Sequence, residues 1–143
     1  MNQPSPNTGN EIVNPSNIRP PIGFSHAVKC HGTMVFVSGA TAADADGAIR
    51  TPNDMVKQYE DALTYIAAVL EASGATMQDV VKLTYFVIDR DAYVANLKPI
   101  GQVYRSFFGK HYPAQSLFGV TALYEKDALL EIEAIACIPD RPA

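Results

Sequence analysis

Three extended segments of the chain are apolar at consecutive positions instead of at alternate ones. They span residues 34–37, 83–88 and 132–138, and β-branched or aromatic side chains are frequent in them. A strand with one face in water alternates apolar and polar side chains, whereas a strand covered on both faces has a nearly continuous apolar run. The three segments therefore predict a sheet that is covered on both of its faces.

One helix is predicted between the first two of these segments. Thr51 is expected to be its N-cap, with Pro52 at the first helical position, and Gly74 is expected to end it. Its apolar residues recur at spacings of three and four, as one face of a helix requires: Met55, Tyr59, Ala62, Leu63, Ile66, Val69 and Leu70.

A second helix is predicted to begin at Asp89 or Asp91, either of which can cap it, and to end at Gly109. Pro99 lies inside its apolar stripe. Because proline has no backbone N–H and clashes with the preceding turn, we expect a break near Lys98.

The remaining extended runs complete the order β-β-α-β-α-β-β. Runs 24–30 and 33–38 are predicted to form a hairpin at His31-Gly32, and runs 116–123 and 129–138 a hairpin around residues 125–127. This order predicts an α+β fold, a two-layer sandwich with both helices on one face of a largely antiparallel sheet. The chain has no element left for the second face, so we expect a homo-oligomer to cover it.

Composition limits the class of protein. A chain of 143 residues is long enough for one domain, which we place at residues 21–138, between a flexible N-terminal arm at 1–20 and a tail at 139–143. The net charge of −4 argues against nucleic-acid binding, which needs a basic surface. We see no membrane-spanning stretch, no signal peptide and too few cysteines for a disulfide framework, and therefore expect a cytoplasmic protein with no membrane partner.

Several motifs, taken in order, resemble the reactive intermediate deaminase (Rid, or YjgF) family. They lie at residues 24–28, 35–39, 68–74, 79–82, 112–114 and 131–136, so that the resemblance covers nearly the whole domain. The resemblance implies a fold like that of the trimeric chorismate mutases. It further implies a homotrimer with clefts between its subunits, a small-molecule substrate and no metal or organic cofactor.

The resemblance also implies a site in which this chain is atypical. Deaminating relatives have an Arg after the Pro-Ala pair that binds the substrate carboxylate, and here that residue is Gln115. The Glu that helps to activate water is retained as Glu131, our candidate catalytic residue. Since glutamine offers a neutral amide where arginine offers a charged fork, either the substrate differs or another cation, for which His111 is a candidate, replaces the Arg.

Other candidate substrate-binding residues are Ser116 beside Gln115, Ser38 at the end of an apolar strand, and Phe24, which stands where relatives commonly have a phenol. Leu117 and Gly101 replace a sulfur-containing residue and an Asn that are common in the family. A metal site at His26, Cys30 and His31 is disfavoured because these residues do not share one strand face and no further ligand cluster is present.

We therefore predict a hydrolytic deaminase of a small enamine or imine, with 2-aminomuconate as one possible type of substrate, since some relatives without the Arg deaminate it. The alternative is a non-catalytic trimer that binds a small molecule. Ribonuclease activity, sometimes attached to relatives, is disfavoured by the acidic net charge.

Overall fold

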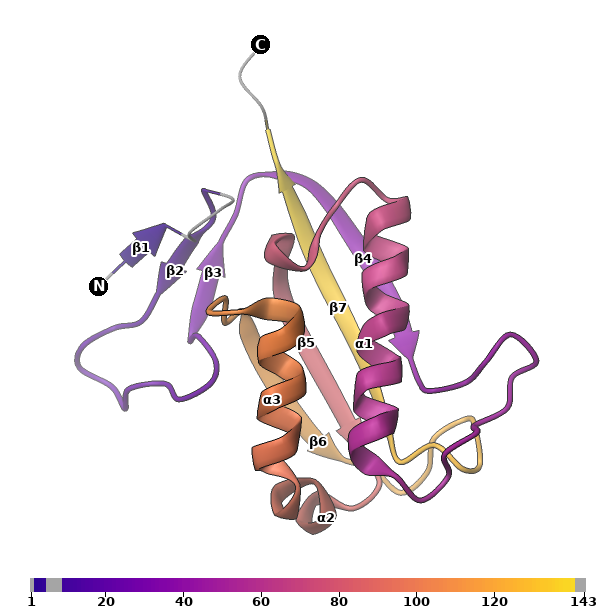
Figure 1. Ribbon diagram of the computed structural model, residues 1–143. Coiled ribbons are helices and arrows are strands. Elements are labelled where there is room, and N and C mark those ends of the chain that lie inside the picture. Colours follow the sequence, from indigo (N-terminus) through magenta and orange to yellow (C-terminus); the bar gives the residue numbers. More distant parts are fainter. Residues whose placement is uncertain (1, 5–8, 141–143) are drawn as a thin grey trace.

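The strands form two sheets, and helices cover one face of the larger sheet (Figure 1). The computed structural model describes residues 2–4 and 9–140. The elements, in chain order, are β1 (Asn2–Pro4), β2 (Glu11–Val13), β3 (Ala27–Lys29), β4 (Gly32–Ala40), α1 (Met55–Ala72), the 3-10 turn η1 (Met77–Asp79), β5 (Val80–Val87), α2 (Arg90–Ala95), α3 (Leu97–Phe108), β6 (Ala114–Gly119) and β7 (Leu130–Pro139).

The main sheet has the strand order β4-β7-β5-β6, and the small sheet has the order β1-β2-β3. Helices α1 and α3 lie side by side across one face of the main sheet (Figure 1). The core lies between these two layers and includes Leu63 and Ile66 of α1, Phe108 of α3, and Leu83 and Ile132 of the sheet. The predicted two-layer α+β architecture is confirmed.

The predicted N-terminal hairpin is wrong. β3 pairs with β2 in the small sheet, while β4 pairs antiparallel with β7. Gly32 stands at the start of β4, where a Cβ would overlap the carbonyl oxygen of Ile138 at the end of β7. The glycine is therefore needed for the close approach of two strands distant in sequence and not for a tight turn.

The predicted C-terminal hairpin is also wrong. β6 pairs in parallel with β5, and α2 and α3 form the crossover between these two strands. The chain then returns from this edge of the sheet to place β7 between β4 and β5. Parallel neighbours need such a long helical connection, so the two helices before β6, α2 and α3, allow it to run parallel to β5.

The helix boundaries follow local capping. Asp54, and not Thr51, is the N-cap of α1, and its carboxylate accepts a hydrogen bond of 2.9 Å from the Lys57 amide. The helix ends as predicted, with Gly74 at a φ of 77° and the Ala75 amide donating to the Leu70 carbonyl.

The second helical region is broken as predicted. Asp89 caps α2, and Asn96 separates α2 from α3, two residues before Lys98. Pro99 therefore falls in the first turn of α3, where a missing N–H leaves no helical hydrogen bond unmade.

The outer face of the main sheet, opposite the helices, carries large apolar side chains. Phe36 is 73% exposed, Phe118 52% and Met34 41%. No helix among the described residues lies on this face (Figure 1). The protomer thus has the second apolar face that the sequence predicts.

The predicted arm and tail fall partly on residues 1, 5–8 and 141–143, which lie outside the described residues. Within the arm, β2 pairs with β3, and Glu11 forms an ion pair of 3.0 Å with Lys29. None of the described helices combines the length and hydrophobicity needed to cross a bilayer.

Candidate functional site

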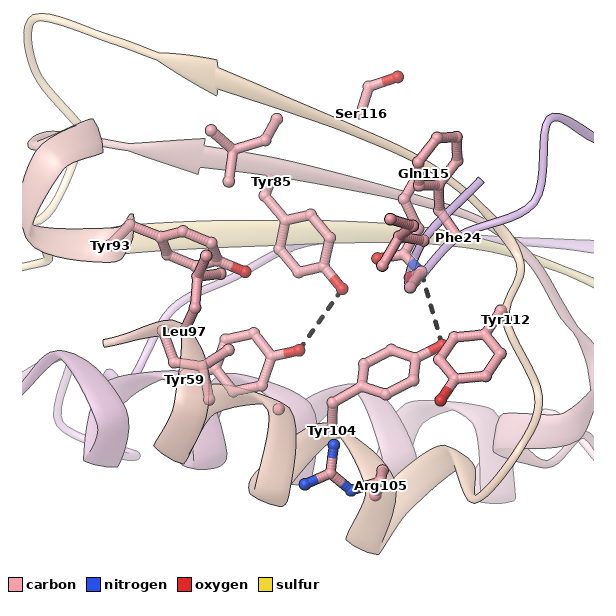
Figure 2. A pocket seen from close by; sticks show the side chains of 15 residues that line it. Phe24, Tyr59, Tyr85, Tyr93, Leu97, Tyr104, Arg105, Tyr112, Gln115 and Ser116 are labelled. Atoms are coloured by element: carbon pink, nitrogen blue, oxygen red, sulfur yellow. Dashed lines mark hydrogen bonds between the residues drawn. The ribbon is translucent and has the colours of Figure 1, made fainter. Parts of the chain in front are cut away.

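A cavity of about 490 Å³ lies between helix α3, strands β5 and β6, and the segment at residues 22–24. Six aromatic rings line it (Figure 2): Phe24, Tyr59, Tyr85, Tyr93, Tyr104 and Tyr112. A volume in this range is typical of sites that hold small molecules.

The register of two parallel strands supplies one wall of the cavity. Gln115 pairs with Leu83 and Leu117 pairs with Tyr85, so both β6 side chains share the helix-facing side of the sheet. The chain before β3 closes this wall because Ser25 forms a parallel bridge with Ala114, which sets Phe24 beside the start of β6.

Gln115 binds protein groups at this wall. Its amide nitrogen donates a hydrogen bond of 2.9 Å to the carbonyl oxygen of Gly23 and one of 3.5 Å to the hydroxyl oxygen of Tyr104. The Tyr104 hydroxyl in turn donates to the backbone carbonyl of His111 over 2.6 Å. Gln115 therefore joins the 22–24 segment to helix α3 across the cavity (Figure 2).

Four phenols of the cavity, those of Tyr59, Tyr85, Tyr93 and Tyr104, stay protonated. Burial raises the pKa of Tyr93 to about 12, and it also raises the pKa values of Tyr59, Tyr85 and Tyr104. The hydroxyls of Tyr59 and Tyr85 lie 3.5 Å apart. These four tyrosines are consequently neutral and present both flat apolar faces and hydrogen-bonding hydroxyls to the cavity.

Arg105 is the one charged side chain among the described residues that line the cavity. It lies one turn after Gly101 on α3, and a Cβ at residue 101 would be 3.3 Å from the Arg105 Nη1 atom. The sequence analysis did not identify Arg105. The sequence feature that could have pointed to Arg105 is its i, i+4 spacing from Gly101, which places both residues on one face of a helix.

The side chains of Ser116 and Ser38 both lie on the side of the sheet opposite the helices. Ser116 is at the rim of the cavity, but its side chain points away from the tyrosines (Figure 2), and its hydroxyl accepts a hydrogen bond of 2.9 Å from Lys82. Ser38 lines a separate outer-face depression together with Lys82 and Glu133.

Glu131 also belongs to the outer face. It pairs with Phe86, and its carboxylate packs against Gly39 of β4. Burial, followed by the nearby charges of Glu125 and Glu133, raises the pKa of the Glu131 carboxyl. A carboxyl with a raised pKa suits proton transfer to and from water.

The two central candidates therefore lie on opposite faces of the main sheet. Gln115 is on the side of the helices, and Glu131 is on the other side with strand β5 between them. Within this chain the predicted catalytic residue Glu131 and binding residue Gln115 do not share one site.

His111 is buried in the protomer, with 1% of its surface exposed. Its Nε2 atom donates a hydrogen bond of 2.7 Å to the Val80 carbonyl oxygen, and burial lowers the pKa of the ring. His111 is not among the residues that line the cavity. This environment favours a neutral imidazole that joins the start of β6 to β5.

Metal-ligating side chains do not gather in the described part of the chain. No group of three or more His, Cys, Asp or Glu residues is placed to hold an ion there. His26 bonds instead to the carbonyl of Arg19, and His31 pairs with Asp140.

Comparison with known proteins gives consistent matches over most of the chain. Residues 15–138 match the family described as Endoribonuclease L-PSP. A RutC family protein of Pyrococcus horikoshii is 34% identical over 127 residues, covering 88% of this chain and 96% of that protein. A 2-iminobutanoate/2-iminopropanoate deaminase of Dermatophagoides farinae is 39% identical over 124 residues, covering 82% and 88%.

A solved structure shares the fold. The Rid family protein YyfB of Yersinia pestis, described as being of unknown function, superposes with a TM-score of 0.79 at 36% identity. The match covers 90% of this chain and 98% of that one.

Proposed function

The chain belongs to the Endoribonuclease L-PSP family, that of the Rid and YjgF proteins, and from this premise we propose that it is a hydrolytic deaminase of a small enamine or imine metabolite. A relative named as a deaminase of 2-iminobutanoate and 2-iminopropanoate supports this reaction class. The observation that carries the proposal is the partly buried Glu131 carboxyl on the outer face of the main sheet, whose pKa is raised chiefly by burial.

The proposed reaction adds water to the C=N bond of an imine. Glu131 takes a proton from water as the oxygen attacks the imine carbon, and Glu131 then returns that proton to the nitrogen to give a carbinolamine. Transfer of the carbinolamine hydroxyl proton to the nitrogen through Glu131 then breaks the C–N bond and releases ammonia, so that one imine and one water yield one carbonyl compound and one ammonia. An enamine reaches the same path after it tautomerises to the imine. General base catalysis of this kind contributes roughly 10²- to 10⁴-fold in rate.

We propose that the active protein is a homotrimer whose subunits meet through the outer faces of their main sheets. Exposed Phe36, Phe118 and Met34 supply the apolar surface for this contact. The opposite orientation of Gln115 and Glu131 supports the same idea, because only a neighbouring subunit can bring a Glu131 face toward the β6 edge of the cavity.

We further propose that the substrate is a planar unsaturated molecule of the 2-aminomuconate type. The six aromatic rings of the cavity favour a flat conjugated ligand over a compact aliphatic one.

Ammonia release from freshly generated imines and from 2-aminomuconate tests the function. We expect turnover by the wild type and a loss of roughly 10²-fold or more in Glu131→Gln. Glu71→Gln, on the exposed side of α1, is the matched control and should retain full activity. Equal turnover by Glu131→Gln and the wild type would contradict the proposed role of this carboxyl.

A non-catalytic small-molecule-binding trimer is the second candidate, because Gln115 stands in place of the carboxylate-binding Arg and its amide is bound to Gly23 and Tyr104. This alternative predicts that imines or their stable analogues raise the melting temperature without any release of ammonia.

A further inference from the structure

Arg105 places a positive charge at the cavity, on the wall that faces Gln115. We propose that Arg105 binds the carboxylate of a planar, conjugated anionic substrate; this inference rests on the proposed function and assigns its substrate class. The charge that relatives carry on the edge strand would thus be supplied here from helix α3.

The first support is that Arg105 is available to bind an anion. No carboxylate among the described residues lies within ion-pair distance of its guanidinium. Arg105 is exposed, and its side chain lies beside Tyr104 on the α3 side of the cavity (Figure 2). A guanidinium with this freedom can present two parallel N–H groups to a carboxylate.

The second support is that Gln115 is already engaged. Both hydrogen bonds assigned to its amide nitrogen go to protein acceptors, one to Gly23 and one to Tyr104. An amide nitrogen carries two hydrogens, so these contacts use its full donor capacity. Binding of a carboxylate by Gln115 would require breaking one of them.

The third support is the absence of a side chain at Gly101. The Arg105 Nη1 atom lies so near that a Cβ at residue 101 would come within 3.3 Å of it. Leu97, Gly101 and Arg105 follow one another at four-residue intervals and all line the cavity. Gly101 therefore leaves room on this helical stripe for the guanidinium to lie back along α3 at the rim of the cavity.

The fourth support is the shape of the aromatic walls. The rings of Tyr104 and Tyr112 stack at 5.5 Å with 9° between their planes, and those of Tyr59 and Tyr85 stack at 6.1 Å with 18°. Parallel rings offer flat surfaces, and a flat conjugated chain can contact them over its whole length. A charge at the rim beside flat apolar walls matches an unsaturated carboxylate.

Calorimetric titration with two stable probes tests this inference. The probes are cis,cis-muconate and adipate, which have the same number of carbons and the same two carboxylates but differ in planarity. We expect the wild type to bind muconate more tightly than adipate. Arg105→Gln should weaken muconate binding by roughly tenfold or more, and Arg105→Lys should weaken it less. Arg90→Gln, an exposed arginine on α2, is the matched control and should bind as the wild type does.

Two further variants separate charge from position. Gly101→Ala keeps Arg105 and shifts its guanidinium by only a few tenths of an ångström, so it should weaken muconate binding less than Arg105→Gln does. The double variant Arg105→Gln/Gln115→Arg should recover affinity by returning the cation to the edge strand. Melting temperatures near that of the wild type show that each variant is folded.

Unchanged muconate affinity in a folded Arg105→Gln protein would overturn the inference, and so would the failure of the wild type to bind either probe. These results are independent of ammonia release. A wild type that releases ammonia while Arg105→Gln binds normally refutes the role of Arg105 alone. If the wild type binds muconate but never releases ammonia, and Arg105→Gln loses muconate binding, the deaminase function is refuted. Arg105 is then a ligand-binding residue.

Discussion

The carboxylate of Glu131 fills the place that a side chain at residue 39 would need, because a Cβ on Gly39 would overlap the Glu131 Oε1 atom. Gly39 lies on β4 and Glu131 on the neighbouring strand β7. The absence of a side chain on one strand therefore sets the position of the candidate catalytic group on the next.

Gly39→Ala should consequently lower activity more than stability. The added methyl group meets the end of a partly exposed side chain that can move aside, but the carboxylate then leaves its position. We expect kcat for ammonia release to fall roughly 10- to 100-fold, as small displacements of a reacting group do. Gly119→Ala, where a Cβ meets nothing within 4 Å, is the control and should be neutral.

The stability of Glu131→Gln relative to the wild type should depend on pH. Burial raises the pKa of Glu131 in the folded state above its unfolded value, so the folded protein holds this proton more tightly. The resulting stabilisation of the wild type is complete below the ordinary carboxyl range and is lost as the pH rises through the folded pKa. Urea unfolding between about pH 4 and pH 8 should therefore show Glu131→Gln gaining on the wild type with rising pH. A difference that stays constant across this range would argue against a perturbed Glu131.

Replacing Gln115 by Ala should loosen the wall of the cavity. The variant loses the hydrogen bonds to Gly23 and Tyr104, each worth about 0.5–1.5 kcal/mol at most in this partly exposed place. We expect faster amide hydrogen exchange at residues 22–24 and little change in exchange within α1. Identical exchange at 22–24 in both proteins would show that Gln115 does not fix this segment.

His111→Phe should reduce stability without reducing affinity for anionic ligands. The substitution leaves the Val80 carbonyl without its 2.7 Å partner, which should lower the free energy of unfolding by about 1–3 kcal/mol. Muconate affinity, measured on the folded fraction, should remain that of the wild type. A selective loss of affinity would instead support His111 as the cation that replaces the family Arg.

The wild type is also stabilised by His111 in a pH-dependent way. Burial lowers the pKa of this ring, so the folded protein favours the neutral form. That stability is present above the unfolded pKa of about 6.5 and is lost as the pH falls toward the lower folded value. The pH dependence of unfolding in this window should be weaker in His111→Phe.

Phe36→Asp should disrupt assembly while leaving the protomer folded. Phe36 is 73% exposed on the outer face, so a charge there meets water in the isolated protomer but would be buried in a sheet-to-sheet contact. Sedimentation should show a trimer for the wild type and a shift toward a 15.5 kDa monomer for the variant. Tyr65→Asp, exposed on α1, is the control for an apolar surface residue away from that face. A wild type that sediments as a monomer would contradict the proposed trimer.

Sequence patterns predicted the helices and the layers well because those depend on local signals. The spacing of Leu63, Ile66 and Leu70 defines one helical face, and Gly74 ends the helix through its own backbone conformation. Consecutive apolar residues such as Val35, Phe36 and Val37 correctly indicated that large apolar side chains lie on both faces of the sheet.

Strand pairing was predicted poorly because it depends on partners distant in sequence. β4 pairs with β7 about a hundred residues later, and no local feature of His31-Gly32 distinguishes that arrangement from a hairpin. Arg105 was missed for a similar reason, since its placement at the cavity depends on the β5–β6 crossover that brings α3 over Gln115.

That crossover also separates the residues that line the cavity from Glu131 along the sequence. Apart from the 22–24 segment and Tyr59, every described residue that lines the cavity belongs to the continuous stretch 85–117, whereas Glu131 lies on β7 outside it. Under the proposed function, changes confined to this one stretch of chain can alter substrate preference, while the proposed general base, Glu131, stays on a central strand. Grafting residues 85–117 between relatives should exchange their ligands and leave the reaction itself unchanged.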